Sequence, residues 1–257
     1  MREVSFYSYV NFGDNLEHLN FLRKVVAKTP DLQVFQYSKP EVLPQLYEVV
    51  EDVPQITLKH VDERPADAIN AWLACDNFIH SFPGRNSEHV KYMIAWFDYL
   101  AKKASLESPI KTVEDLLMDY PALLKPVPVP DYYDILVINS PPCSGQYRGW
   151  NPGEWAALIN DLAKKNTVIT TEKVDSFPCT RDFGLSLTGI GSLSRTVRNI
   201  IGVATGPIWP TLNIWNHDRL NLRVMFVDNE HLRYDSRSHT TSDMNRARQL
   251  AQENGLL

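Results

Sequence analysis

Four prolines lie within residues 121–130, and they divide the sequence into two parts that repeat one pattern. Proline fixes φ and has no backbone N–H, so Pro126-Val127-Pro128-Val129-Pro130 favours an extended conformation and excludes a helix interior or a central strand. We interpret the stretch from 120 to 134 as a stiff linker at a domain boundary. The sequence therefore predicts an N-terminal domain at 1–125 and a C-terminal domain at 131–257.

Short apolar strands alternate with helices in the first part. We expect strands at 4–9, 32–37 and 55–61, a turn at 11–15, and helices beginning at 16 and spanning 41–50, 66–82, 88–103 and 113–123. This alternation predicts βαβ units and a parallel sheet.

The alternation begins again after the prolines. Strands are expected at 134–139, 167–171, 200–204 and 221–227, and helices at 192–199, at 241–254 with Thr241 or Ser242 as the cap, and from Asn151-Pro152. Asparagine is a favoured N-cap and proline a favoured first helical residue. The expected fold is α/β, with two Rossmann-like domains facing across a cleft. The C-terminal helix could pack back on the first domain.

Composition excludes several classes of protein. With 257 residues, 44% hydrophobic and 22% charged, the chain has the balance of a globular protein, and no apolar run is long enough to cross a membrane. The net charge of −5 argues against non-specific nucleic-acid binding. Residues 131–257 are neutral overall, which makes the second part the better place for a phosphorylated ligand. Three cysteines without metal spacing indicate reduced thiols and a cytoplasmic setting.

Ligands of open parallel sheets bind where strands end and helices begin, and the first such loop is Asn11-Phe12-Gly13-Asp14-Asn15. Gly13 allows a tight turn or the close approach of a ligand. A carboxylate at Asp14 could act as a general base. The alternative is that Asp14 or Asn15 only caps the helix.

Two further loops follow strands of the second part. The segment 140–150 contains Ser140, Ser144 and Arg148, and these hydroxyls and the guanidinium suit a diphosphate. Thr205-Gly206-Pro207 joins a strand to a helix, where free amides and the helix dipole would favour an anion. The alternatives are an ordinary surface loop and a simple tight turn.

Several motifs are incomplete or missing. The segment from Gly189 to Ser194 lacks the third glycine of a dinucleotide fingerprint, and the sequence has no phosphate-loop lysine, no Gly-x-Ser-x-Gly and no His-Glu-x-x-His. The seven histidines do not pair at ligand spacing, so no metal site is predicted.

Two of these loops, read with their neighbours, resemble glycosyltransferase family 9, the ADP-heptose:lipopolysaccharide heptosyltransferases and their relatives. Gly13-Asp14-Asn15-Leu16 matches the family's Gly-Asp before an apolar helix. Leu187-Thr188-Gly189-Ile190-Gly191-Ser192-Leu193 and Val203-Ala204-Thr205-Gly206-Pro207-Ile208-Trp209 match its Leu-Thr-Gly, Ser-Leu and Asp-Thr-Gly-Pro-x-His motifs. Ala204 stands in place of the family's acid, and Trp209 in place of its histidine.

The resemblance implies the GT-B architecture and transfer of a sugar from a nucleotide-sugar, as co-substrate, to an acceptor hydroxyl without a metal or another cofactor. If the family's residue roles are transferred to the matching positions of this sequence, Asp14 is the general base, and Asn11 and Gly13 lie on the acceptor side. Thr205, Gly206 and Pro207 hold the donor diphosphate. Glu172 and Lys173 follow a strand where the donor's ribose or base would pass.

Two other functions are compatible with the same residues. One is a nucleotide-sugar epimerase or hydrolase, and the other is a protein that binds nucleotide-sugar without turnover, which the changes at Ala204 and Trp209 make conceivable. The acceptor is left open between a glycan, a modified nucleobase, a protein and a small molecule.

Overall fold

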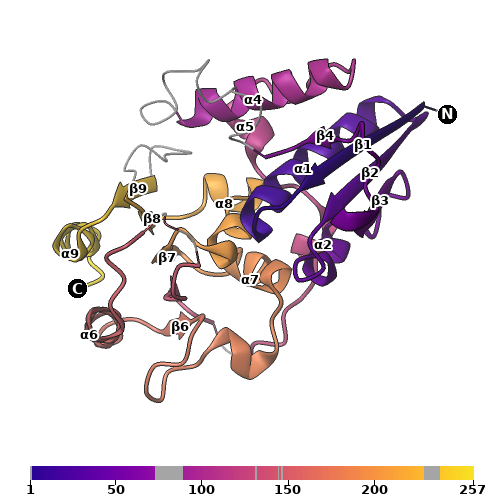
Figure 1. Ribbon diagram of the computed structural model, residues 1–257. Coiled ribbons are helices and arrows are strands. Elements are labelled where there is room, and N and C mark those ends of the chain that lie inside the picture. Colours follow the sequence, from indigo (N-terminus) through magenta and orange to yellow (C-terminus); the bar gives the residue numbers. More distant parts are fainter. Residues whose placement is uncertain (1, 73–88, 131, 144, 146, 229–237) are drawn as a thin grey trace. The chain divides into compact units, whose positions relative to one another are not determined.

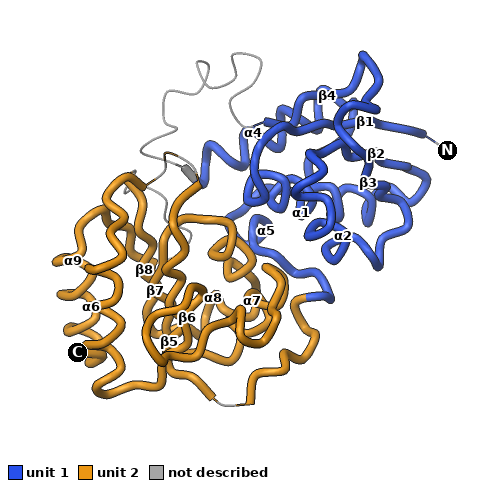
Figure 2. Tube along the Cα trace, turned by 60° about the horizontal axis from the view of Figure 1, so that its bottom comes forward, with its two compact units in different colours: residues 1–122 blue, residues 123–257 orange. Residues whose placement is uncertain are grey.

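A computed structural model describes residues 2–72, 89–130, 132–143, 145, 147–228 and 238–257. The chain divides into two compact units, Met1–Ala122 and Leu123–Leu257 (Figure 2). Each unit contains one sheet, and all strand pairs described in both sheets are parallel. The α/β class and the parallel sheets predicted from the sequence are thereby confirmed.

The sheet of the first unit has the strand order β3-β2-β1-β4 (Figure 1). Its strands are β1 (Arg2–Ser8), β2 (Leu32–Ser38), β3 (Ile56–His60) and β4 (Ile69–Asn70), and its helices are α1 (Phe12–Lys28), α2 (Leu43–Val50), α4 (His89–Lys103) and α5 (Val113–Leu116). Short 3-10 turns are formed by Val61–Glu63 and by Pro121–Leu124 at the boundary between the units.

A chain of aromatic rings connects the sheet of the first unit to two helices. The ring of Phe6 on β1 meets His18 of α1 edge-on at 5.0 Å, and His18 stacks on Phe21 at 5.8 Å. Phe21 in turn stacks on Phe97 of α4 at 4.9 Å. All four rings are buried, so they form part of the core of this unit.

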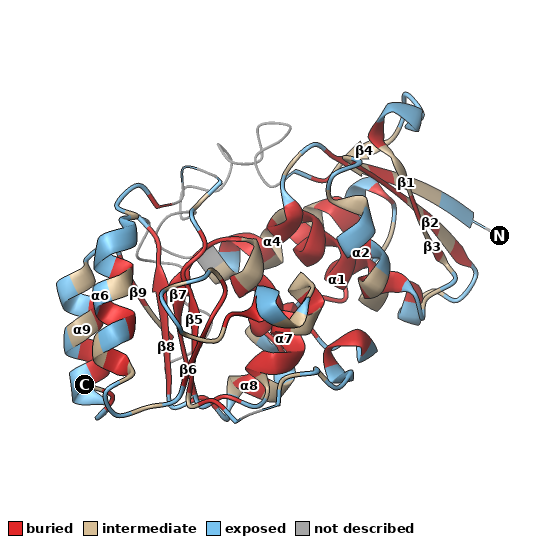
Figure 3. Ribbon diagram, turned by 90° about the horizontal axis from the view of Figure 1, so that it is seen from below, coloured by how far each residue is buried: buried red, intermediate tan, exposed pale blue. Residues whose placement is uncertain are grey.

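The sheet of the second unit has the order β6-β5-β7-β8-β9. Its strands are β5 (Ile135–Ile138), β6 (Val168–Thr170), β7 (Asn199–Val203), β8 (Leu222–Phe226) and β9 (Ser238–Thr241). Its helices are α6 (Pro152–Leu162), α7 (Leu187–Ser194), α8 (Ile214–His217) and α9 (Met244–Glu253), with 3-10 turns η3 (Thr180–Phe183) and η4 (Gly206–Thr211). Helices α6 and α9 cover one face of the sheet, and α7 and α8 the other (Figure 3).

The core of the second unit follows the two-residue period of its strands. Ile135 and Val137 of β5 pack with Trp155 and Leu158 of α6 and with Leu250 of α9. Strands buried on both faces are typical of parallel sheets.

The predicted cap of α6 is confirmed, because the Asn151 side chain accepts hydrogen bonds from the N–H groups of Gly153 (2.8 Å) and Glu154 (3.3 Å).

Several predicted element boundaries were wrong. Helix α1 begins at Phe12 rather than Leu16, α5 ends at Leu116, and α7 spans Leu187–Ser194 in place of 192–199. Residues 69–70 form strand β4 inside the predicted helix 66–82, of which 73–82 lie outside the described residues. The predicted helix 241–254 begins only at Met244, because β9 ends at Thr241 and Asp243 caps α9. The C-terminal helix packs on the core of its own unit.

Within the described ranges, no helix is both long and apolar enough to cross a membrane.

His18 is a buried ionisable group in the core of the first unit. Neither of its ring nitrogens has a hydrogen-bond partner of ordinary geometry among the described residues. Burial lowers the pKa of His18 from 6.5 to about 3, against a smaller opposing effect of the Gln36 side chain. The ring is therefore neutral in the folded protein at pH 7.

We expect His18 to reduce stability in mild acid. Below pH 6.5 the unfolded chain binds a proton at this residue and the folded chain does not, so the free energy of unfolding falls as pH falls towards about 3. The slope is about 1.4 kcal/mol per pH unit, or about 2 kcal/mol between pH 6.5 and pH 5. Denaturant unfolding of the wild type and of His18→Leu at several pH values measures the difference. Equal pH dependence in the two proteins would contradict the assignment.

Candidate functional site

Among the described strands, the order along each sheet reverses at one point. In the second unit the chain continues from β5 to β6 on one side and then places β7 on the other side of β5. In the first unit the reversal lies between β1 and β4. The crevice at the carboxyl ends of the strands beside such a reversal is the usual ligand site of an open parallel sheet.

The predicted residues lie beside both reversals. In the first unit Asn11 follows β1, and Gly13 and Asp14 belong to the helix that starts there. In the second unit Ser140 follows β5 and Thr205 follows β7, two strands that pair from Ile135↔Asn199 to Ile138↔Gly202. Topology thus gives both sets a position suited to ligand binding, and their contacts with a ligand remain predictions.

The first turn of α1 differs from the expected loop. Asn11 is the N-cap residue and its side chain makes no capping hydrogen bond, whereas Asp14 is the third helical residue and is half-buried. Neither Asp14 nor Asn15 is therefore the N-cap. An acidic side chain in the first turn of a helix is favoured by the helix dipole.

Asn15 holds this turn against the sheet. The fully buried side chain donates from Nδ2 to the carbonyls of Val10 and Asn11, at 3.0 Å each. Its Oδ1 accepts a hydrogen bond from the Ser38 hydroxyl at the end of β2, at 2.8 Å. The carboxamide thus joins the ends of β1 and β2 to the start of α1, one residue after Asp14.

The residues that follow β6 form two ion pairs with η3. Arg181 pairs with the carboxylate of Glu172, and the Lys173 ammonium lies 2.8 Å from Asp182. The hydrogen bond from Lys173 lowers the pKa of Asp182, helped by a smaller contribution from the Cys179 N–H. The predicted positive charge of Lys173 is therefore balanced by an acid of the same unit.

The loop after β5 contributes Ser140 and Arg148. Ser140 is buried, and its hydroxyl lies 2.9 Å from that of Thr171 at the end of β6. Arg148 is exposed, and its guanidinium lies 4.0 Å from the carboxylate of Asp228, which also accepts from the Arg148 N–H at 3.3 Å. Ser144 lies outside the described residues.

The Thr205-Gly206-Pro207 segment differs in part from the prediction of free amides before a helix. The following element, η4, is a 3-10 segment of six residues, too short for a strong dipole. The Thr205 N–H already donates to the Val203 carbonyl at 2.7 Å, and Pro207 has no N–H. Among the described residues nothing accepts from the Gly206 N–H, so it is the backbone donor that this segment offers an anion.

A buried polar network fixes η4 on α7. The Asn216 side chain donates to the Ser194 hydroxyl at 2.6 Å and to the Thr211 carbonyl at 2.9 Å, and Asn213 donates to the Pro210 carbonyl at 2.9 Å. These groups are almost fully buried. The amide donors of this network are satisfied, whereas Asn216 Oδ1 has no partner among the described residues. Buried hydrogen bonds of this kind favour one arrangement of the backbone, here that of the segment after β7.

The two positions that depart from the family motif are buried. Ala204 is fully buried and its N–H donates to the Phe226 carbonyl at 3.0 Å, and Trp209 is 9% exposed. Each of these side chains is therefore part of the packing of the second unit.

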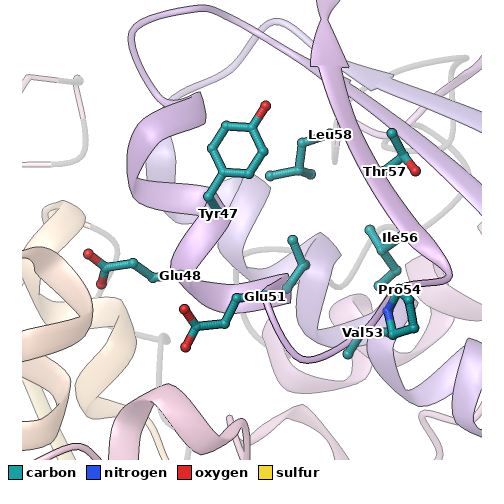
Figure 4. Close-up of a pocket in the computed structure, with 9 residues that line it drawn as sticks. Tyr47, Glu48, Glu51, Val53, Pro54, Ile56, Thr57 and Leu58 are labelled. Atoms are coloured by element: carbon teal, nitrogen blue, oxygen red, sulfur yellow. The ribbon is translucent and has the colours of Figure 1, made fainter.

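The described cavities do not coincide with the predicted residues. One of about 520 Å³ lies between α2 and the start of β3, lined by Tyr47, Pro54, Leu58 and their neighbours (Figure 4). The other, of about 310 Å³, lies between the starts of α6 and α9. There burial and the carboxylates of Glu154, Asp228 and Asp243 raise the pKa of Tyr147, and such a negative site is unsuited to phosphate.

Sequence reasoning missed the residues that hold the site together. Asn139 and Thr171 each follow a strand of the second unit directly, and this was the available signal. Asn213 and Asn216 lie in a short helical segment that the sequence did not indicate. No group of three or more potential metal ligands occurs in the part of the chain that the structure describes.

Known structures with a similar fold are glycosyltransferases. E. coli heptosyltransferase WaaC with ADP-2-deoxy-2-fluoro heptose aligns over 98% of this chain and 99% of its own, with a TM-score of 0.61 and 13% identity. WaaC with ADP gives a TM-score of 0.62, 12% identity and the same coverage. The dodecameric iron-containing heptosyltransferase TibC of enterotoxigenic E. coli, with ADP-D-beta-D-heptose, gives 0.57 and 15% identity over 92% of this chain and 62% of its own.

No protein-family model and no curated protein matches the sequence. The structural likeness confirms the heptosyltransferase-like fold that the motifs predicted.

Two glycines of α7 give a matched test of the packing against η4. A Cβ at Gly191 would lie 2.5 Å from Leu123 Cδ2, 2.8 Å from Pro210 Cβ and 2.9 Å from the Pro210 carbonyl oxygen, whereas at Gly189 the nearest atom lies at 3.4 Å. We expect Gly191→Ala to lower the free energy of unfolding by about 1–3 kcal/mol. Gly189→Ala should leave it unchanged or raise it by up to about 1 kcal/mol. Denaturant unfolding measures both, and equal stability of the two variants would show that α7 does not need this close approach.

Proposed function

We propose that the protein is a glycosyltransferase that moves a sugar from a nucleotide-sugar donor to an acceptor hydroxyl. The observation that carries the proposal is the heptosyltransferase-like fold, which extends over 98% of the chain. One protein with this fold, WaaC, was solved with an ADP-sugar analogue. Asn11, Ser140 and Thr205 support it, because they follow the strands beside the reversal in each sheet.

The second unit would hold the donor. The Gly206 N–H and the Thr205 hydroxyl would contact the diphosphate, with Pro207 fixing the backbone between strand and 3-10 turn. Ser140, Ser144 and Arg148 would approach it from the loop after β5. Glu172, with its carboxylate beside Arg181, is suited to accept hydrogen bonds from ribose hydroxyls, and Lys173 would contact the donor while paired with Asp182.

The first unit would activate the acceptor. In the proposed step the Asp14 carboxylate takes the proton of the acceptor hydroxyl, the hydroxyl oxygen bonds to the anomeric carbon, and the bond from that carbon to the diphosphate breaks. Asn11 and Gly13 would border the acceptor.

Charge on the leaving nucleoside diphosphate would be stabilised by fixed donors without a metal. A backbone N–H that is already oriented does not reorganise as charge develops, and one such donor contributes about 3 kcal/mol to transition-state stabilisation. We therefore expect activity to be insensitive to chelators.

Nucleotide binding is the first test. Nucleoside diphosphates and their sugars, at about 100 times the dissociation constant, should stabilise the protein by about 2.7 kcal/mol and raise its melting temperature. If none of a panel of ADP, UDP, GDP, CDP and their sugars shifts the transition, the donor side of the proposal is wrong. A shift without release of nucleoside diphosphate under any acceptor would instead support a binding protein, and conversion of the sugar without an acceptor would support an epimerase or hydrolase.

Asp14→Asn tests the base. We expect turnover, measured as release of nucleoside diphosphate from the donor that binds best, to fall at least about a hundredfold with nucleotide affinity unchanged. Asp31→Asn, at an exposed position before β2, serves as the control and should keep full turnover. Wild-type turnover in Asp14→Asn would assign this carboxylate to helix stabilisation alone.

A further inference from the structure

The side chain of Asn139 connects the ends of two neighbouring strands in the second unit. Asn139 follows β5, and only 4% of it is exposed. Its Oδ1 accepts hydrogen bonds from the N–H groups of Glu172 (2.9 Å) and Thr171 (3.2 Å), and its Nδ2 donates to the Glu172 carbonyl at 3.2 Å. One carboxamide therefore binds both backbone polar groups of Glu172.

These contacts begin where the strand pairing stops. The register of β5 and β6 ends at Val137↔Thr170, with one further hydrogen bond from the Thr171 N–H to the Val137 carbonyl at 3.0 Å. Beyond it the chain turns away towards η3, and the side chain of Asn139 takes the place of a strand partner for Glu172. Among the described residues, Asn139 Oδ1 is the acceptor for the Glu172 N–H.

The same residue also reaches the loop after β5. The Asn139 N–H donates to the Thr171 hydroxyl at 3.1 Å, and that hydroxyl lies 2.9 Å from the Ser140 hydroxyl. The Asn139 carbonyl accepts from Trp150 Nε1 at 3.2 Å, at the far end of the loop. The Thr171 hydroxyl also donates to Asn139 Oδ1 at 3.3 Å, so the buried carboxamide holds Glu172 directly and Ser140 through Thr171.

We propose that Asn139 is a positioning residue for the nucleotide: it sets the backbone of Glu172 and the hydroxyl of Ser140 without touching the ligand. This inference rests on the proposed function, since it assigns the nucleotide to that edge of the sheet. A carboxamide suits the task because it presents an acceptor and a donor side by side, matching the N–H and C=O of a single residue. Neither an apolar side chain nor a carboxylate offers both.

Asn139→Ala tests the proposal, and Asn166→Ala is its matched control. The Asn166 side chain donates to the carbonyls of Leu162 (2.7 Å) and Leu256 (2.9 Å), so the control removes two hydrogen bonds of the same unit at the opposite end of β6. Affinity for the nucleoside diphosphate that binds the wild type best is measured by calorimetry well below the melting temperature. We expect about a tenfold or greater loss in Asn139→Ala and wild-type affinity in Asn166→Ala.

Amide hydrogen exchange, measured without ligand, tests separately whether the Asn139 side chain anchors the backbone of Glu172. The Glu172 amide should exchange about tenfold faster or more in Asn139→Ala and at the wild-type rate in Asn166→Ala. The Thr171 amide, which keeps the Val137 carbonyl as an acceptor, should change less. An unchanged Glu172 rate would overturn the anchoring role.

Asn139→Asp separates positioning from a general loss of packing. It keeps the shape, but its carboxylate places a second acceptor against the Glu172 carbonyl and offers no donor there. We therefore expect its affinity at pH 8 to fall at least as far as that of Asn139→Ala. Wild-type affinity in Asn139→Asp would contradict the proposal.

The outcomes for the two proposals are distinct. Wild-type affinity in Asn139→Ala, together with faster Glu172 exchange, overturns this inference and leaves the glycosyltransferase proposal standing. Failure of the wild type to bind any nucleotide of the panel overturns the proposed function and, with it, this inference.

Discussion

Parallel strands cannot be joined by tight turns, and this constraint determines the position of the polar residues in both units. Each described strand pair is parallel, so the connections cross the sheet and the carboxyl ends of the strands gather at one edge. Where the strand order reverses, the connections leave in opposite directions and the edge opens between them. Ser140 and Thr205 flank that opening in the second unit because they follow β5 and β7.

Buried carboxamides stabilise these edges where the strand pairing ends. Asn15 joins the ends of β1 and β2 to α1, Asn139 joins β5 to the chain leaving β6, and Asn216 joins η4 to α7. An asparagine side chain carries the same donor and acceptor as a peptide group, so it can replace a strand partner where the backbones separate. Buried polar groups that are satisfied in this way favour one backbone arrangement over others.

The charges at the edge of the second unit are largely balanced. Lys173 pairs with Asp182, Arg181 with Glu172, and Arg148 lies beside Asp228. These pairs are exposed and contribute little to stability, so their arrangement affects mainly the local potential. Under the proposed function, a donor diphosphate at this edge would therefore meet cations that are already paired, together with neutral hydrogen-bond donors.

The sequence by itself determined the α/β class and most of the strands, since runs such as 135–138 and the cap at Asn151 depend on neighbouring residues. It did not determine β4 or β9, whose two and four residues become strands only by pairing with β1 and β8. Nor could it show that Asn139 binds Glu172 or that Asn216 binds Ser194, because these partners are 33 and 22 residues apart. Local patterns specify elements, whereas strand order and the contacts of buried polar groups depend on the energy of the whole packed unit, which only the tertiary structure decides.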